Sequence, residues 1–273
     1  MSLPLCLTIA GSDSSAGAGL QADLRTFNAM GCYGISVVTA LTAQKPESVR
    51  CVHPIPLSVV REQLLVCLEL RPDVIKTGML YSSETVAMVR ELLEDFHGEI
   101  VTDPVMIAGS GATLSEPDFI LEFRKFIKSD VTVLTPNLPE ALALIDDANF
   151  PDTAALASHL TDTFDTTVYL KGGHADDEMD RGTDYLATRD GCSVLELPVL
   201  KPIESHGTGC AMASGIAAGI ATGMDVEAAA IAAKRFVWSS LKNSTMITDV
   251  FAARSSIRDF DMNANMDVLV RRL

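Results

Sequence analysis

Short apolar runs alternate with amphipathic segments along most of the chain. An apolar run over 3–10 ends at Gly11, and residues 20–30 follow with apolar side chains at helical spacing and Gly31 as a stop. The same pattern predicts further strands at 35–39, 48–53, 73–76, 100–102, 131–134 and 167–170. It predicts further helices at 57–70, 84–96, 119–128, 138–145, 153–161, 210–222 and 226–241.

This order of elements predicts an α/β fold. Strands that alternate with helices form a mostly parallel central sheet with helices on both faces. Runs at 185–188 and 193–197 flank Asp190-Gly191, which favours a hairpin. No linker rich in Pro or Ser divides the chain, so we expect one domain over 1–273. The pattern weakens from Asn243 onward, and an arm, a crossing helix and a disordered tail all fit that segment.

Composition and charge exclude several classes of protein. Hydrophobic residues make up 48% of the chain, which excludes a disordered protein. The chain has 21 basic and 36 acidic residues, a net charge of −15, and it contains no basic run. Nucleic acids and anionic membranes are therefore not expected partners, because both are bound by clustered Lys and Arg. One anionic ligand in a local pocket remains compatible with this charge.

Targeting and redox features point to a cytoplasmic protein. A secretory signal typically begins with Lys or Arg, and no Lys or Arg precedes the first apolar run of this chain. The uncharged stretch 205–224 is long enough to span a bilayer, but it has five glycines and few large apolar residues, so we predict a buried helix. The six cysteines form no C-x-x-C pair and no zinc-ligand spacing, which indicates reduced thiols in the cytoplasm.

A glycine-rich loop is predicted over 11–19, between the first strand and the first helix. Residues 17–22, Gly-Ala-Gly-Leu-Gln-Ala, fit the G-x-G-x-x-A pattern of dinucleotide-binding proteins. The loop is too long for the tight turn of that fold, and no acidic residue lies between Asp23 and Glu47 to bind a ribose. Glycines that only let the chain turn are another interpretation. We favour a loop that faces a substrate.

A second glycine-containing segment, His206-Gly207-Thr208-Gly209-Cys210, opens a helix of small residues. Backbone N–H groups at a helix start, together with the helix dipole, form an anion site that needs no Lys or Arg. Cys210 lies in the first helical turn, where the same field lowers the pKa of a thiol. A reactive thiol and a buried apolar cysteine fit this position equally well.

Asp103, Glu140 and Lys171 each follow the end of a predicted strand. Ligands of open α/β sheets bind at the carboxyl ends of strands, and carboxylates there can hold Mg²⁺. The alternatives are a turn former before Pro104 for Asp103, a helix N-terminal acid for Glu140 and a solvated lysine for Lys171. Together with the anion site, these residues indicate a phosphoryl transferase. The chain has no G-x-x-x-x-G-K-[ST] sequence, so it is not a P-loop enzyme.

These motifs resemble one kinase family. They are residues 7–13 (LTIAGSD), 17–23 (GAGLQAD), 38–44 (VTALTAQ), 76–80 (KTGML), 103–105 (DPV), 135–141 (TPNLPEA), 171–174 (KGGH) and 206–210 (HGTGC). Their order from about residue 5 to about 240 is similar to that of hydroxymethylpyrimidine/phosphomethylpyrimidine kinases of thiamine biosynthesis. That family belongs to the ribokinase-like superfamily, whose N-x-x-E signature matches Asn137 to Glu140.

The resemblance implies a kinase that uses ATP and Mg²⁺ and works as a cytoplasmic homodimer. Its small-molecule substrates would be 4-amino-5-hydroxymethyl-2-methylpyrimidine, a pyrimidine alcohol, and then the monophosphate of that alcohol, which becomes the diphosphate. A pyridoxal or pyridoxine kinase of the same family is the nearest alternative. A non-catalytic pyrimidine-binding protein and a dinucleotide oxidoreductase are more distant ones.

The resemblance also implies roles for individual residues. Gln44 should hydrogen-bond the aminopyrimidine, and the other substrate-binding residues should be Gly11, Ala18, Asp23, Met79 and Val105. Asp103 and Glu140 should organise Mg²⁺. The nucleotide should be bound by Lys171, Asn137 and Glu140. Cys210 occupies the place of the catalytic base, and the catalytic group is completed by Gly207, Thr208 and Gly209.

Overall fold

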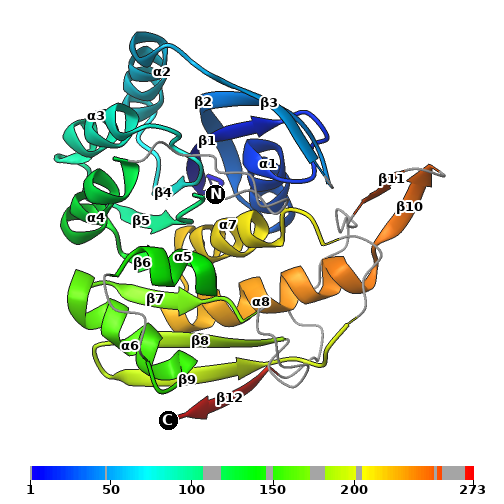
Figure 1. The fold of residues 1–273 in the computed structure, drawn as a ribbon. Helices are drawn as coiled ribbons and strands as arrows, with labels where there is room; N and C mark the ends of the chain where they lie inside the picture. The colour runs from blue at the N-terminus through cyan, green and yellow to red at the C-terminus, as the bar shows by residue number, and fades with distance from the viewer. Residues whose placement is uncertain are drawn as a thin grey trace.

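In a computed structural model, a ten-stranded sheet runs through the centre of the protein (Figure 1). The structure describes residues 2–46, 48–106, 118–145, 150–172, 182–200, 205–248, 251–253 and 268–273. The strand order is β12-β9-β8-β7-β6-β5-β4-β1-β2-β3. The strands are β1 (Leu5–Asp13), β2 (Tyr33–Lys45), β3 (Ser48–Pro54), β4 (Val74–Thr77), β5 (Glu99–Thr102), β6 (Val133–Leu134), β7 (Thr167–Leu170), β8 (Thr183–Thr188), β9 (Gly191–Glu196) and β12 (Leu269–Arg272).

The centre of the sheet is parallel and its margins are antiparallel. Strands β2, β1, β4, β5, β6 and β7 pair in parallel along the sheet. Strand β3 pairs antiparallel with β2, and β8, β9 and β12 continue antiparallel beyond β7. The mostly parallel sheet and the β8–β9 hairpin are therefore confirmed. The carboxyl ends of the parallel strands share one edge, where residues far apart in the sequence meet.

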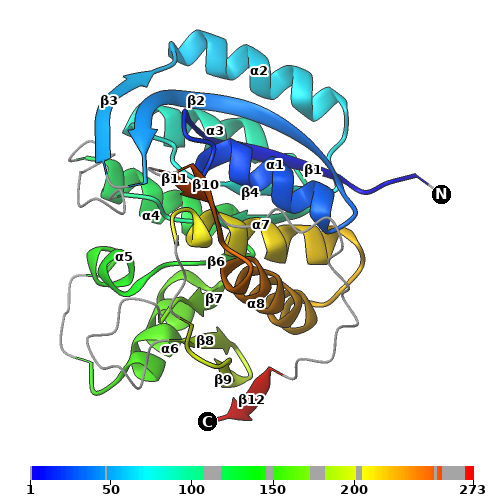
Figure 2. The ribbon, with the colours of Figure 1, turned by 90° about the vertical axis from the view of Figure 1, so that its right-hand side faces the viewer.

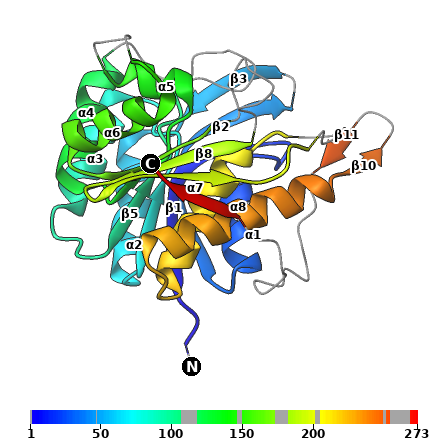
Figure 3. The ribbon, with the colours of Figure 1, turned by 90° about the horizontal axis from the view of Figure 1, so that it is seen from below.

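Helices cover both faces of this sheet (Figure 3). One face carries α2 (Leu57–Glu69), α3 (Ser83–Leu93), α4 (Phe119–Asp130), α5 (Leu138–Ala143) and α6 (Thr153–Phe164). Figure 2 shows the helices of the other face side by side: α1 (Gly19–Ala29), α7 (Thr208–Ala221) and α8 (Val226–Lys242). The predicted helices are thus confirmed, with ends that shift by up to three residues.

Alternation along the short parallel strands divides the core in two. Successive side chains of a strand point to opposite faces, so each strand supplies both layers. The layer under α2–α6 includes Leu7, Ile9, Ile75, Ile100, Leu134, Val168 and Leu170. The layer under α1, α7 and α8 includes Cys6, Val74, Val101, Val133 and Tyr169. This two-sided burial explains why the strands have continuous apolar runs in the sequence.

Helix α7 lies against the sheet between α1 and α8, and it is buried as its small residues predict. Its residues from Ala211 to Gly219 are all buried. A Cβ atom at Gly219 would lie 2.7 Å from the Cβ atom of Ala229 on α8, so the two helices approach more closely than larger residues would allow. No helix in the described part of the chain is long and apolar enough to cross a membrane.

The prediction of a loop over 11–13 is wrong, because β1 continues to Asp13 through an irregularity between Ala10 and Ser12. The segment from Asn243, which the sequence leaves open, contributes short strands. Strands β10 (Thr245–Thr248) and β11 (Phe251–Ala253) form a separate ribbon that projects beyond α8 (Figure 1). Strand β12 completes the sheet beside β9.

Candidate active site

The predicted site residues gather at the carboxyl edge of the parallel sheet. Asp103 directly follows β5, Asn137 follows β6, and Lys171 follows β7. Asn137 and Lys171 form an isolated parallel bridge, so the sheet pairing extends into the site. The first turn of α7 reaches the same edge from the helical layer. Short strands thus bring together groups separated by up to about a hundred residues.

A lysine between two carboxylates forms the charged part of the site. Lys171 Nζ lies 2.7 Å from Asp103 Oδ1 and 3.7 Å from Glu140 Oε2. Both carboxylates are buried, at 2% and 4% exposure for Asp103 and Glu140. Burial lowers the pKa of Lys171, but Asp103 and Glu140 outweigh it and hold that pKa above its ordinary value. Lys171 is therefore a permanent cation at this edge.

Glu140 serves the local fold and the site at once. Its N–H donates to Asn137 Oδ1 at 2.8 Å, and Asn137 N–H donates to Glu140 Oε2 at 2.8 Å, which is a capping box at the start of α5. Burial raises the pKa of Glu140 to about 7, although Lys171 opposes the shift. The alternative that Glu140 is a helix N-terminal acid is thus also true, and the cap fixes its carboxylate beside Lys171.

The glycines that are expected to form an anion site lie at the first turn of α7. Gly207, its N-cap, has a φ of 77°, and a Cβ there would lie 2.1 Å from the carbonyl oxygen of Gly17. Only glycine fits that backbone and that contact. The N-cap supplies no side-chain hydrogen bond to the helix start. A Cβ at Gly209 would lie 3.1 Å from Lys171 Nζ and 3.6 Å from Asp103 Oδ2, so this turn adjoins the charged group.

The thiol of Cys210 is desolvated, which agrees with the second of its two interpretations. The sequence suggests a thiol whose pKa is lowered by the helix start, but burial raises the pKa of Cys210 to about 11. Lys76 and the backbone N–H of Gly19 oppose this rise, whereas Asp23 and Asp103 add to it. Although the residue keeps partial exposure, the surrounding protein desolvates its sulfur. The ligand-free thiol is therefore protonated at neutral pH.

A fully buried ion pair lies beside Cys210. Lys76 Nζ donates to Asp23 Oδ2 at 2.8 Å, and both side chains are 0% exposed. Asp23 also accepts hydrogen bonds of 2.6 Å from Thr8 and from Ser214, which lies one turn after Cys210 on α7. The structure thus places Asp23, expected beside the substrate ring, in the core with three protein donors. Lys76 was not predicted as a site residue. A lysine inside an apolar strand of four residues is nevertheless a visible sign of a buried charge with a partner.

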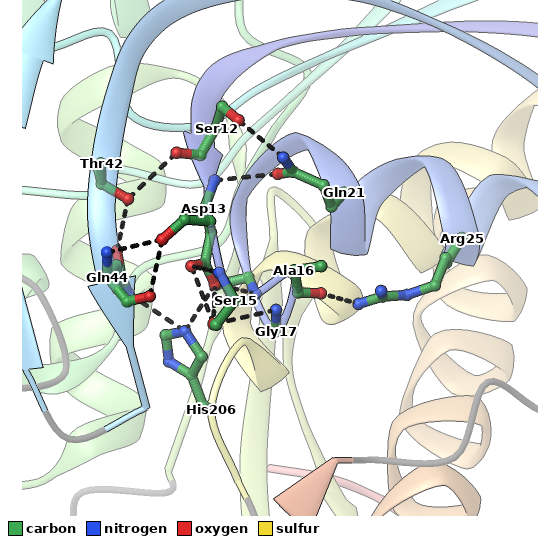
Figure 4. A network of polar contacts seen from close by, with 12 residues as sticks. Ser12, Asp13, Ser15, Ala16, Gly17, Gln21, Arg25, Thr42, Gln44 and His206 are labelled. Atoms are coloured by element: carbon green, nitrogen blue, oxygen red, sulfur yellow. Dashed lines mark hydrogen bonds and ion pairs between the residues drawn. The ribbon is translucent and has the colours of Figure 1, made fainter. Parts of the chain in front are cut away.

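The opposite side of the site is a polar network around His206 (Figure 4). His206 Nε2 lies 2.9 Å from Asp13 Oδ2 and 3.1 Å from Gln44 Nε2. Asp13 also accepts the N–H of Ala18 at 2.8 Å. Burial would raise the pKa of Asp13, but His206 and the N–H groups of Ala18 and Ser15 lower it to about 2. The contact between Asp13 and His206 was not predicted, because the sequence pattern places Asp13 in a loop and the two residues are far apart in the chain.

The remaining substrate-binding candidates form an apolar wall next to this network. Met79 packs against Ala40, and Val105 packs on the same pair. A Cβ at Gly11 would lie 2.4 Å from Met79 Cε, so glycine there makes room for the methionine. The predicted residues therefore separate into a polar rim with Gln44, an apolar wall with Met79 and Val105, and a charged group with Asp103 and Lys171.

The charged group suits Mg²⁺ only as part of a complex with phosphate. No group of three His, Cys, Asp or Glu side chains that could hold a metal occurs among the residues that the structure describes. Asp103 and Glu140 offer two carboxylates, and Mg²⁺ is usually held by one or two carboxylates together with substrate phosphates and water. The residues present therefore fit a cation that arrives with a phosphate ligand.

Comparisons with known proteins agree with this arrangement. A family model described as phosphomethylpyrimidine kinase matches residues 13–253. The hydroxymethylpyrimidine/phosphomethylpyrimidine kinase of Bacillus subtilis is 34% identical over 89% of this chain and 91% of its own length. The Escherichia coli enzyme of that name is 40% identical over 78% of this chain and 81% of its own. The chain spans 47% of a chloroplastic thiamine biosynthetic bifunctional enzyme of Arabidopsis thaliana, at 40% identity.

Solved structures share the fold. A pyridoxal kinase from Staphylococcus aureus in complex with AMP-PCP and pyridoxal has a TM-score of 0.85 and 32% identity, and the match covers 100% of both chains. A phosphomethylpyrimidine kinase from Clostridium difficile has a TM-score of 0.73 and 33% identity over 86% of this chain and 98% of its own. The fold is thus ribokinase-like, and the chain belongs to the phosphomethylpyrimidine kinase family of phosphotransferases.

Proposed function

We propose that this kinase transfers the γ-phosphate of ATP to the hydroxymethyl oxygen of 4-amino-5-hydroxymethyl-2-methylpyrimidine, and then a second phosphate to the monophosphate, in thiamine biosynthesis. The observation that carries the proposal is the position of Gly209, whose Cβ site lies 3.1 Å from Lys171 Nζ and 3.6 Å from Asp103 Oδ2. Helix-start amides, a lysine and an acid there surround one small volume. Phosphoryl transfer depends on such positioned charges.

The nucleotide side is formed by Lys171, Asp103 and Glu140. Lys171 balances the charge of the transferred phosphate, and the amides of the α7 start hold its oxygens. Asp103 and Glu140 would hold Mg²⁺, which would neutralise charge on the ATP phosphates. In the ligand-free protein Lys171 Nζ lies 2.7 Å from Asp103 Oδ1, so a phosphate bound beside that carboxylate would lie within reach of the lysine. We include a cytoplasmic homodimer in the proposal, as the family resemblance suggests.

The acceptor side is formed by Gln44, Met79 and Val105. In the ligand-free protein the Gln44 amide is occupied, since its Oε1 accepts from Thr42 Oγ1 at 3.1 Å and its Nε2 lies 3.1 Å from His206. The pyrimidine ring takes over one of these partners when it binds. Met79 and Val105 then pack on the flat face of the ring. Asp23 supports this side from the core and does not contact the ring.

Cys210 receives the hydroxyl proton in the first step. The thiol first loses its own proton to solvent, because only the thiolate can accept the hydroxyl proton. Lys76 and the Gly19 N–H are the groups that favour this thiolate. In the second step the acceptor is a phosphate oxygen that already carries negative charge, so no base is required. The two steps therefore share the anion site and differ in their need for Cys210.

Pyridoxal kinase activity is the second candidate. The S. aureus pyridoxal kinase structures match with TM-scores of 0.85 to 0.87, above the 0.73 of the C. difficile phosphomethylpyrimidine kinase. Both alcohols are flat heteroaromatic rings with a hydroxymethyl arm, so the fold accommodates either. The curated relatives carry the pyrimidine kinase name at 34% to 41% identity, which favours the pyrimidine.

The deciding experiment compares kcat/KM for the two alcohols under identical conditions with saturating MgATP. We expect the pyrimidine alcohol to be phosphorylated with the higher kcat/KM. A higher value for pyridoxal would assign the chain to the second candidate. The Gln44→Ala variant is the matched control, because loss of a ring hydrogen bond should reduce the preference between the alcohols and leave ATP hydrolysis in their absence unchanged.

A further inference from the structure

A second buried lysine–aspartate pair lies behind the nucleotide side of the site. Lys234 Nζ on α8 donates to Asp184 Oδ2 on β8 at 2.6 Å. The two residues are 5% and 8% exposed. Tyr169 on β7, fully buried, donates its hydroxyl to the same Oδ2 at 2.6 Å. Burial and the Asp184 carboxylate raise the pKa of Tyr169 well above its ordinary value, so the hydroxyl stays a donor.

This pair also holds backbone groups on both sides of residues 173–181. The N–H of Gly172 donates to Asp184 Oδ1 at 2.8 Å, and Lys234 Nζ donates to the carbonyl oxygen of Gly182 at 2.8 Å. Gly182 has a φ of 99°, and a Cβ there would lie 3.1 Å from a backbone oxygen. One ion pair therefore fixes the backbone that follows β7 and the backbone that precedes β8 relative to each other.

The bond to Gly172 reaches the charged group through one residue. Lys171 precedes Gly172, and its N–H donates to the carbonyl oxygen of Pro136 at 2.8 Å. The backbone of Lys171 is thus held by the segment that follows β6 on one side and, through Gly172, by Asp184 on the other. Its side chain then reaches Asp103 at 2.7 Å. A shift of Gly172 would move the Lys171 ammonium relative to the α7 start.

We propose that Asp184 and Lys234 are positioning residues for nucleotide binding, which act by fixing the backbone at Lys171-Gly172 and at Gly182. The inference rests on the proposed function only in taking a nucleotide phosphate as the ligand of Lys171. The pair should not affect binding of the acceptor alcohol, because Gln44 lies on β2 and Met79 and Val105 follow β4 and β5. The pair should therefore affect the binding of the nucleotide and not the binding of the acceptor alcohol.

The test uses Lys234→Met in the full chain, with ADP binding measured by calorimetry in the absence of acceptor and KM measured for both substrates. Loss of a buried charge-assisted contact should weaken ADP binding and raise the KM for ATP about tenfold or more. The acceptor KM should stay within about twofold, the range of surface substitutions remote from a site. Because this variant leaves a buried carboxylate uncompensated, the double variant Asp184→Asn/Lys234→Met provides a second measurement with no buried charge.

Leu160→Ala is the matched control. Leu160 is fully buried on α6, which packs on β7 and β8 from the opposite face, so its truncation destabilises the same strands without touching the pair. We expect reduced stability in the control with ADP affinity unchanged. Normal ADP affinity in both Lys234 variants, or an equal loss in the control, would overturn the inference. Absence of ADP binding by the unaltered protein would instead contradict the proposed function.

Discussion

Two buried lysine–aspartate pairs lie behind the site, one near Cys210 and one near Lys171. The first acts on a thiol and the second on backbone groups. Asp23 and Asp184 each accept three donors, one of them a lysine. The donors to Asp23 are side chains, and its partner Lys76 influences the thiol of Cys210. Asp184 and its partner Lys234 instead bind backbone groups that flank residues 173–181.

The difference shows that burial of a charge pair does not fix its role. The pair at Asp23 adjusts a reactive group, so its effect should depend on which step needs that group. The pair at Asp184 sets a backbone position, so its effect should appear in both steps alike. Variants of the two lysines can therefore be told apart by the ratio of the first phosphorylation to the second.

The largest effect should follow Cys210→Ala. The variant removes the base and leaves the amides of the α7 start in place, so the first phosphorylation should slow by about 10²–10⁴-fold, the usual range for general base catalysis. The second phosphorylation and ADP affinity should change little. An unaltered kcat for the first step would reduce Cys210 to a packing residue.

The ionisation of Cys210 should be visible without substrate. Its pKa is raised to about 11 by burial, so the thiolate fraction is small at neutral pH and grows with pH. Alkylation of Cys210 by iodoacetamide should then speed up about a hundredfold from pH 7 to pH 9, because the thiolate is the nucleophile. Mass spectrometry of the peptide separates it from the exposed Cys51. A rate that levels off near pH 7 would mean that the helix start outweighs burial.

Lys76→Met should break the first of the two pairs. An opposite charge nearby favours the thiolate, so its loss should slow the first step roughly tenfold or more and leave the second step nearly unchanged. The uncompensated Asp23 should also cost about 3–5 kcal/mol of stability, measured by urea denaturation.

Asp23→Asn/Lys76→Met serves as the control for stability, since it removes both charges. It should recover most of the unfolding free energy but not the first-step rate. Lys234→Met, in contrast, should leave the ratio of the two steps unaltered. If both lysine variants change that ratio equally, the two pairs do not differ as described.

Gln44→Ala should have the narrowest effect, on substrate binding alone. The amide is partly exposed and already has partners in His206 and Thr42, so its loss should raise the acceptor KM by the equivalent of roughly 1–3 kcal/mol. The KM for ATP should be unaffected. An acceptor KM within twofold of the unaltered enzyme would remove Gln44 from the ring-binding side.

The sequence predicts the sheet and most of the site because both depend on local pattern. Apolar runs such as 73–76 and helical spacing in 226–241 determine the elements, and residues that follow parallel strands must meet at one edge. Asp103, Glu140 and Lys171 are found in that way, and the structure brings them together.

What could not be predicted depends on long-range contacts. The partners Asp23 and Lys76 are 53 residues apart and Asp184 and Lys234 are 50 apart, so no spacing links them. The direction of the Cys210 pKa shift stays open in the sequence, because the helix start is visible there and the burial of the sulfur is not. Strand β12 was missed because it is short and mostly exposed, and because its pairing with β9 is a contact between segments far apart in the sequence.

The central claim is that one site phosphorylates the pyrimidine alcohol twice. It is tested most directly by following ³¹P resonances while the purified protein acts on 4-amino-5-hydroxymethyl-2-methylpyrimidine with MgATP. We expect a monoester that rises first and is then converted to the diphosphate. In Cys210→Ala the first stage should be lost, and the second should be retained when monophosphate is supplied. A reaction that stops at the monoester, or a protein that phosphorylates pyridoxal and leaves the pyrimidine untouched, would contradict it.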